Sequence, residues 1–175
     1  MTDHIRLLLV RHGETDWNRQ RRYQGQSDVP LNETGRAQAA AAARRLAQQQ
    51  ISHIVSSDLR RAQQTAQVIA AQCQMQVRPD PRLREISFGA WEGLTHDQIQ
   101  TRWPGARSAW FADPVHTAPP EGETLTQVSE RIQAALDEIA RERTGQTVAL
   151  VAHGGVLRTL ICLAVGLDPQ VQWRF

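Results

Sequence analysis

Near the amino terminus stands the stretch Ile5-Arg6-Leu7-Leu8-Leu9-Val10-Arg11-His12-Gly13, in which an apolar run leads directly into Arg-His-Gly. A short apolar run rich in branched side chains predicts a buried strand, here from Ile5 to Arg11. This strand would carry a guanidinium and an imidazole to its carboxyl end, where open α/β sheets bind their ligands. We therefore expect His12 to lie in a ligand-binding crevice.

The same pattern returns late in the chain, where Thr147-Val148-Ala149-Leu150-Val151-Ala152 is followed by His153-Gly154-Gly155. Either histidine alone could equally be a structural residue held by hydrogen bonds. Two strand-ending histidines, each followed by glycine, instead predict two imidazoles that meet at one edge of a sheet.

Strand and helix patterns alternate between these two stretches. Asn32 can cap an alanine-rich helix, and Thr124 with Gln127 forms a capping box before a helix that is apolar on one face. The expected strands are 5–11, 51–56, 75–78 and 147–152, and the expected helices are 33–49, 59–73, 125–139 and 155–165. This order predicts an α/β fold, a three-layer α/β/α sandwich with a mostly parallel sheet.

Length and composition limit the class of protein. With 175 residues the chain has the size of one domain, and it contains neither an apolar run long enough for a membrane helix nor a secretory signal. Cys73 and Cys162 stand apart in apolar helical contexts, which favours small buried side chains in a reducing compartment. We therefore expect a cytoplasmic protein without a membrane partner.

All 20 basic residues are arginine. The absence of lysine excludes Schiff-base chemistry, pyridoxal phosphate anchoring and a P-loop lysine. Arginine offers a permanently charged fork that suits phosphate or carboxylate, although genomic base composition explains most surface arginines equally well. A net charge of +2 without an aromatic-rich basic stripe gives no reason to expect nucleic acid.

Metal-assisted chemistry is the main chemical alternative, because the chain holds six histidines and many carboxylates. It contains no His-x-x-x-His, His-Glu-x-x-His or Cys-x-x-Cys spacing, so the usual zinc signatures are missing. We expect no metal and no cofactor.

Four motifs occur in order along the chain. They are Arg11-His12-Gly13-Glu14-Thr15, Ser57-Asp58-Leu59-Arg60-Arg61-Ala62-Gln63-Gln64-Thr65-Ala66, Leu83-Arg84-Glu85 and His153-Gly154. Together they resemble the histidine phosphatase superfamily, in the branch of cofactor-dependent phosphoglycerate mutases and their phosphatase relatives. The resemblance covers nearly the whole chain.

The resemblance implies a phosphate site built around His12 as nucleophile. Neutral imidazole can attack phosphorus without a metal, and positive charge around the transferring group supplies most of the catalysis. Arg60 and Arg61 both fall in the first turn of a helix that Ser57 or Asp58 could cap, where a bound anion would be favourable. The family motif selects Arg61. The expected phosphate-binding residues are Arg11, Asn18, Gln24, Gly25, Arg61 and His153, the last as a further positive charge; for Gln24 and Gly25 an ordinary loop turn is an equal alternative.

The general acid is less determined by the residues themselves. Glu14, Glu85, Glu92 and Glu121 are all candidates, and a surface ion pair with Arg82 or Arg84 is the alternative for Glu85. The segment Leu83-Arg84-Glu85-Ile86-Ser87-Phe88-Gly89 is similar to the family segment that carries the proton donor, so the resemblance assigns this role to Glu85.

The resemblance leaves three functions open. A phosphomonoester hydrolase is favoured, because Glu85 is followed by a phosphatase-like segment rather than by the Arg-His-Tyr-like segment of the mutases. A phosphoglycerate mutase-type phosphotransferase and a non-catalytic phospholigand-binding protein are the alternatives. The substrate would be a small phosphorylated metabolite, and a homodimer is compatible with the family.

Residues 1–175 are expected to form one domain, with residues 94–122 as a lid that places Trp103, Trp110 and Phe111 near the substrate. Family members usually continue past a Trp-x-Phe like that at 173–175 into another strand. A C-terminal strand would therefore be missing here, or this edge of the sheet is built differently.

Overall fold

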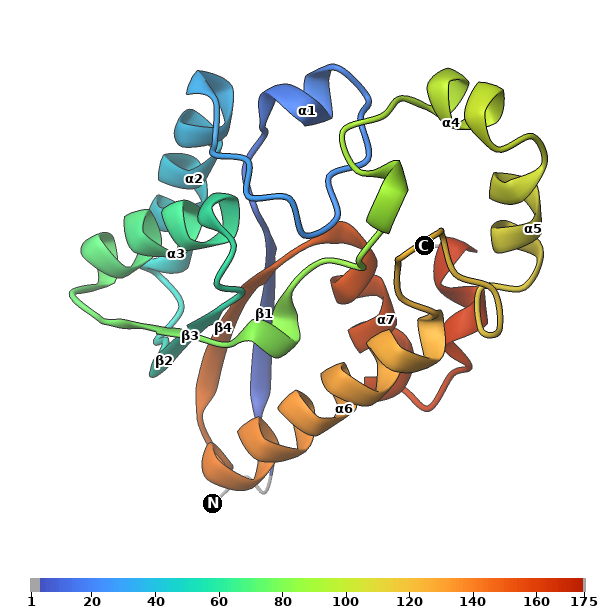
Figure 1. Cartoon of the computed structure of the whole chain (residues 1–175). Helices are drawn as coiled ribbons and strands as arrows, with labels where there is room; N and C mark the ends of the chain where they lie inside the picture. The colour runs from blue at the N-terminus through green and yellow to red at the C-terminus, as the bar shows by residue number, and fades with distance from the viewer. Residues whose placement is uncertain (1–3, 175) are drawn as a thin grey trace.

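The sheet has four strands, which all run parallel in the order β1-β4-β2-β3 (Figure 1). In this computed structural model, which describes residues 4–174, the strands are β1 (Arg6–Arg11), β2 (His53–Ser56), β3 (Val77–Pro79) and β4 (Thr147–Ala152). The register pairs Arg6 with Thr147 and Arg11 with Ala152. β1 and β4 therefore end at the same level, and the residues that follow them are neighbours.

Helices cover both faces of the sheet. α2 (Glu33–Leu46) and α3 (Arg60–Cys73) pack on one face, and α6 (Leu125–Glu142) and α7 (Gly154–Ala164) pack on the other (Figure 1). Along β4 the side chains alternate, because Val148 and Leu150 join the α6/α7 core whereas Ala149 and Val151 join the α2/α3 core. The predicted three-layer α/β/α sandwich is confirmed.

A third, smaller core lies beside the sheet in the proline-rich middle of the chain. It contains Trp91, Ile99 and Trp110, and the two indole rings meet edge to face at 6.0 Å. The short elements of this region are the 3₁₀ helices Pro81–Leu83 and Gly89–Trp91 and the helices α4 (His96–Arg102) and α5 (Ala106–Ala112), while α1 (Asp16–Arg19) follows β1 and a 3₁₀ helix spans Pro169–Arg174.

The bounds of the elements differ from the sequence prediction by a few residues, and the residue that caps α3 is not one of those predicted. Its N-cap is Leu59, which makes no side-chain capping bond, so the prediction of a cap by Ser57 or Asp58 was wrong. Both side chains have other partners: His153 binds the Ser57 hydroxyl, and Arg84 forms a bidentate ion pair with Asp58. Asn32 does cap α2, as predicted.

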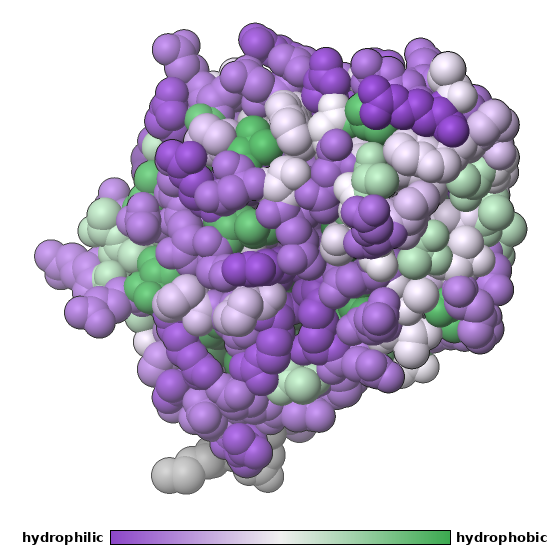
Figure 2. Space-filling view, viewed as in Figure 1, coloured by the Kyte–Doolittle hydropathy of each residue, from purple (hydrophilic) through white to green (hydrophobic). Residues whose placement is uncertain are grey.

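The surface seen in Figure 2 is mostly hydrophilic, with small separate apolar areas. The large apolar side chains that the described residues expose are Phe111, Val165 and Leu167. Across residues 4–174, no helix combines the length and the hydropathy that crossing a membrane requires. Phe175, the end of the Trp-x-Phe motif, lies outside the described residues.

Candidate active site

The two histidines singled out by the sequence lie together at the carboxyl ends of β1 and β4. Their ring centroids are 5.1 Å apart, and the backbone N–H of His12 extends the strand ladder by donating to the carbonyl of Ala152 over 3.0 Å. Both rings are buried. The register of two parallel strands therefore produces the pair.

One nitrogen of His12 is fixed by its own backbone. Nδ1 lies 2.7 Å from the carbonyl oxygen of Gly13, which can only accept, so Nδ1 carries the proton and Nε2 keeps its lone pair. Burial, and next the charge of Arg61, lower the pKa of His12 from 6.5 to about 3. His12 is therefore a neutral imidazole with Nε2 available as a nucleophile at neutral pH.

The loop that orients His12 is itself held closely. The N–H of Gly13 donates to the Thr65 hydroxyl over 3.1 Å, and a Cβ placed on Gly13 would lie 2.3 Å from the carbonyl oxygen of Gly35 in α2. Only glycine fits such a backbone approach. Both glycines thus serve to bring α2 against the turn after β1.

His153 has both ring nitrogens occupied. Arg61 donates from Nε to Nδ1 over 3.2 Å, so the ring proton is on Nε2 and faces the Ser57 hydroxyl at 2.8 Å. Burial, followed by the charge of Arg61, keeps the pKa of His153 well below its ordinary value. The expectation that His153 brings a positive charge is therefore wrong for the free protein, because protonating Nδ1 would break the bond from Arg61.

Arg61 is the central cation of the site, and its residue is fully buried. Its two terminal nitrogens donate to the carbonyls of Ser27 and Gly25, over 2.7 and 2.6 Å. Burial lowers the pKa of Arg61, while the nearby carboxylates, Glu85 first, oppose that shift. Arg60 instead donates its backbone N–H to Asp28 and is exposed, so the preference for Arg61 over Arg60 agrees with their positions.

Asn18 and Gln24 are linked through Thr15. The backbone N–H of Thr15 donates to Asn18 Oδ1 over 3.0 Å, and its hydroxyl donates to Gln24 Oε1 over 2.8 Å. With both amide oxygens occupied, the amide nitrogens are the groups left to donate to an anion. Gly25 has φ +48° and gives its carbonyl to Arg61.

Glu85 accepts two backbone hydrogen bonds, from Gly155 in the first turn of α7 (3.2 Å) and from Ile86 (3.0 Å). It does not form the alternative ion pairs, because Arg82 binds Asp80 and Glu138, and Arg84 binds Asp58. A Cβ on Gly155 would lie 2.6 Å from the Glu85 carboxylate, so glycine makes room for it.

Two adjoining open clefts, of about 430 and 310 Å³, share Arg11, His12 and Asn18 as lining residues. The first adds Glu14, and the second adds Gln24, Gly25, Arg61 and Glu85 together with Tyr23 and Phe88. The clefts thus gather the predicted site residues except His153, which is buried and accepts a hydrogen bond from Arg61. Neither Glu92 nor Glu121 lines them.

The expected lid aromatics do not reach these clefts. Trp110 is 2% exposed within the third core, and neither Trp103 nor Phe111 is among the lining residues. Tyr23 and Phe88 take that position, with their rings in edge contact at 5.0 Å.

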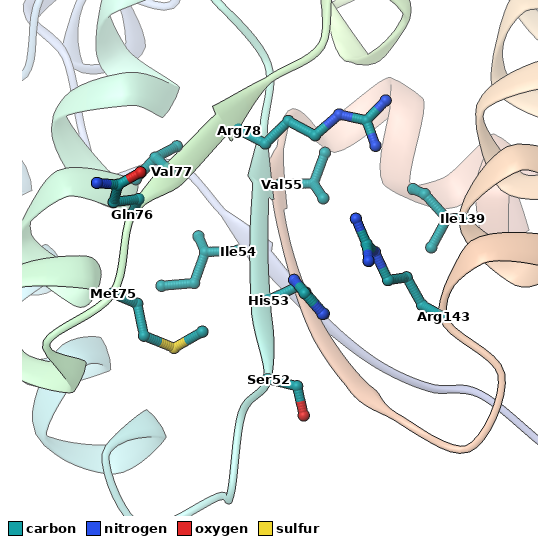
Figure 3. Close-up of a pocket in the computed structure, with 10 residues that line it drawn as sticks. All are labelled: Ser52, His53, Ile54, Val55, Met75, Gln76, Val77, Arg78, Ile139 and Arg143. Atoms are coloured by element: carbon teal, nitrogen blue, oxygen red, sulfur yellow. The ribbon is translucent and has the colours of Figure 1, made fainter.

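A further cleft of about 310 Å³ lies at the opposite, amino end of β2 and β3 (Figure 3). Figure 3 shows His53, Val55 and Arg143 on one side of β2, and Ile54 and Met75 on the other. Arg78 in this cleft is neutralised by Glu138 and Glu142. Arg143 is likewise paired with Glu142, and the cleft has a single histidine, His53, in place of the two histidines and buried arginine at the carboxyl edge of the sheet. We therefore take the carboxyl edge as the candidate site.

Sequence reasoning missed three supporting residues, Ser57, Thr65 and Arg131. Arg131 on α6 donates to the carbonyls of Arg82, Arg84 and Glu85 and thereby fixes the segment that carries Glu85. Ser57 and Thr65 stand inside the second motif, where only their position beside Arg61 could have indicated a role. Arg131 also forms a bidentate ion pair with Glu123, but its contacts with the segment of Glu85 are to backbone atoms 46 to 49 residues away, which no local pattern indicates.

Comparison with known proteins gives consistent matches. The sequence model of the histidine phosphatase superfamily (branch 1) matches residues 7–175. A Yersinia pestis protein named "Probable phosphoglycerate mutase GpmB" is 41% identical over 170 residues, which cover 97% of this chain and 79% of that protein.

Solved structures are equally similar. A mycobacterial glucosyl-3-phosphoglycerate phosphatase, solved as a complex with VO3, has a TM-score of 0.90 and 41% identity, covering 97% of this chain and 84% of its own. The alpha-ribazole phosphatase from Shigella flexneri has a TM-score of 0.89 and 32% identity, with coverage of 97% and 84%.

Proposed function

The chain belongs to the histidine phosphatase superfamily, branch 1, and from that membership we propose that it hydrolyses phosphomonoesters through a phosphohistidine on His12. The observation that carries this proposal is the state of His12. Its Nδ1 is committed to Gly13, its pKa is about 3, and its Nε2 is left unprotonated beside a buried guanidinium.

In the first step, Nε2 of His12 attacks phosphorus, a P–N bond forms, and the P–O bond to the leaving alcohol breaks. Arg11 and Arg61, with the amides of Asn18 and Gln24, bind the equatorial oxygens and neutralise their charge. Glu85 receives the proton that a monoanionic phosphomonoester brings and passes it to the leaving oxygen.

In the second step, water attacks phosphorus from the side that the alcohol has left. Ionised Glu85 takes the proton from this water, the P–N bond breaks, and inorganic phosphate leaves. The departing phosphate takes the proton from Glu85, and the enzyme returns to neutral His12, so no oxidant, metal or cofactor enters the cycle.

A phosphoglycerate mutase is the second candidate, because relatives such as the Yersinia protein carry that name. The same phosphoenzyme would serve both reactions. The hydrolase is preferred because the two solved structures described above are named phosphatases and the segment after Glu85 reads Ile86-Ser87-Phe88-Gly89.

The remaining features of the proposal are coarser. The substrate is a small phosphorylated metabolite, the compartment is the cytoplasm, and a homodimer is compatible with the fold. Residues 94–122 act as the lid of a single domain that spans residues 1–175. The role of residues 94–122 as a lid is supported by the hydrogen bond, 2.7 Å long, from Arg107 to the hydroxyl of Tyr23, which lines the cleft.

The test is to trap the phosphoenzyme. Acid quenching is too harsh for an N-phosphate, so turnover of a labelled substrate should be stopped in alkali, where the label should persist and then be lost in acid. EDTA should not prevent labelling, and His12→Ala should abolish both label and turnover. Label that is stable in acid but lost in alkali, or that survives in His12→Ala, would contradict the proposal.

A further inference from the structure

Glu92 does not line the clefts, but its carboxylate accepts four hydrogen bonds. Oε1 accepts the backbone N–H groups of Gln26 (2.9 Å) and Phe88 (3.1 Å), and Oε2 accepts the N–H and the hydroxyl of Ser27 (2.8 and 2.6 Å). With four donors bound, this carboxylate is not placed to exchange a proton with a substrate. Its function must be sought in what it holds.

What it holds is the loop from Gln24 to Ser27, here called the phosphate loop. In Figure 1 this loop follows α1 and lies beside the green segment that carries Glu92. A Cβ placed on Gly25 would lie 1.9 Å from Glu92 Oε1, and Gly25 has φ +48°. The loop therefore rests directly on the carboxylate, which only glycine at position 25 allows.

The opposite side of the same loop anchors Arg61. The carbonyl of Gly25 and the N–H of Gln26 belong to one peptide group, whose oxygen binds Arg61 and whose nitrogen binds Glu92. Because a peptide group is planar, it cannot rotate away from Glu92 without also turning its oxygen away from Arg61. Ser27 adds a second link through two successive peptide groups, because its N–H donates to Glu92 and its carbonyl accepts from Arg61.

We propose that Glu92 is a positioning residue, which fixes Arg61 for phosphate binding through the peptide groups of the phosphate loop. The negative charge of Glu92, after those of Glu85 and Asp28, also opposes the lowering of the pKa of Arg61 that burial causes. The inference rests on the proposed function, since it assigns Arg61 to the phosphate.

The main variant is Glu92→Gln, which keeps the side-chain volume but replaces one acceptor oxygen by a donor that cannot bind N–H groups. The probe is vanadate, a mimic of the transferring phosphate. A hydrogen bond to a charged group contributes enough that we expect the inhibition constant for vanadate to rise roughly tenfold or more. The ratio of rates on an alkyl phosphate and p-nitrophenyl phosphate should not change, because Glu92 is not the acid.

The matched control is Glu138→Gln. It makes the same change at a carboxylate that binds Arg78 and Arg82 and has no contact with the phosphate loop. It should leave vanadate inhibition unchanged. In the Arg61→Lys background, Glu92→Gln should lose most of its effect, because the two residues act through the same peptides. If Glu92→Gln does not fold, Ser27→Ala removes a single bond to Glu92 and should weaken vanadate binding by a smaller factor.

Three results would overturn the proposal: vanadate inhibition like that of the wild type in folded Glu92→Gln, an undiminished effect in the Arg61→Lys background, or a selective loss on the alkyl phosphate. The affinity for inorganic phosphate can be measured by calorimetry without turnover, so it tests the role of Glu92 separately from the proposed hydrolysis. A protein that binds phosphate with Glu92-dependent affinity but forms no phosphoenzyme would therefore disprove the proposed function and leave the role of Glu92 intact.

Discussion

His12, His153 and Arg61 form a buried group in which one cation and two neutral rings are held by hydrogen bonds to uncharged atoms. Backbone carbonyls bind the terminal nitrogens of Arg61, and a hydroxyl binds His153. Burial and the charge of Arg61 both disfavour protonation of the imidazoles. The pKa values of both imidazoles are therefore lowered, and the proposed nucleophile, His12, needs no partner base.

This arrangement predicts how stability depends on pH. The folded pKa of His12 is about 3, below the ordinary value of 6.5, and that of His153 is also lowered. Between these pH values the unfolded chain binds more protons, so the histidine contribution is fully present above pH 6.5 and is lost as the pH falls toward 3.

Denaturant unfolding from pH 7 downward should show this loss. Each histidine contributes at most about 1.4 kcal/mol per pH unit, so His12→Gln should flatten the slope by up to that amount. Carboxylates titrate in both proteins and cancel in the comparison. Parallel slopes for the variant and the wild type would refute the buried neutral state of His12.

A second prediction at this scale concerns Glu85. Glu85→Gln keeps the acceptor for Gly155 but cannot donate a proton to a leaving group. Turnover of an alkyl phosphate should fall by roughly 10²–10⁴-fold, and that of p-nitrophenyl phosphate, whose leaving group hardly needs a proton, much less. Steady-state rates on both substrates measure this. Equal losses would mean that Glu85 only positions the phosphate.

The elements that could be predicted from the sequence are those marked by a local apolar pattern or a local capping residue. The runs that became β1 and β4, the cap of α2 and the capping box of α6 are local signals, and each lies where it was expected. The cap of α3 could not be predicted, because Ser57 is taken by His153, 96 positions away. The prediction that Trp110 lies near the substrate was wrong, because the sequence does not show whether an aromatic residue of a loop region packs on other rings or on a ligand.

The contact between α2 and the turn after β1 gives a prediction for an element. In an open helix, Gly→Ala stabilises by about 1 kcal/mol. Gly35→Ala should instead destabilise, by roughly 1–3 kcal/mol, because its Cβ would lie 2.1 Å from the carbonyl oxygen of Glu14.

Chemical denaturation together with the turnover rate measures this effect. The matched control is Ala41→Gly on the exposed side of α2, which should cost about 1 kcal/mol and leave turnover unchanged. A stabilised, fully active Gly35→Ala protein would show that α2 does not constrain His12.

At the scale of the whole molecule, three strands supply the site from both sides of β4. β1 leads into His12, β4 into His153, and β2 into the segment that places Arg61 on α3. Such convergence at the carboxyl edge follows from a parallel sheet, and for this reason the paired histidines could be predicted without coordinates. The strand order and the long-range bonds of Arg131 could not, because they depend on packing of the complete chain.

The choice between hydrolase and mutase belongs to this scale, because it depends on whether water reaches the phosphoenzyme. Both clefts are open. We predict phosphate release from several monoesters, with negligible conversion of 3-phosphoglycerate to 2-phosphoglycerate even when 2,3-bisphosphoglycerate is supplied. Parallel assays of phosphate and of isomerised product decide the matter, and isomerisation that outpaces release by about an order of magnitude would establish the mutase.

The hydrogen bond from Nδ1 of His12 to Gly13 has a regiochemical consequence. An imidazole has two nitrogens that can carry a phosphoryl group, and the resulting regioisomers differ in their intrinsic rates of hydrolysis. Because the backbone retains the proton on one nitrogen, the proposed mechanism leads only to the isomer phosphorylated on the other. The proposed intermediate would therefore be a single compound with one lifetime, specified by a main-chain atom that no side-chain substitution can remove.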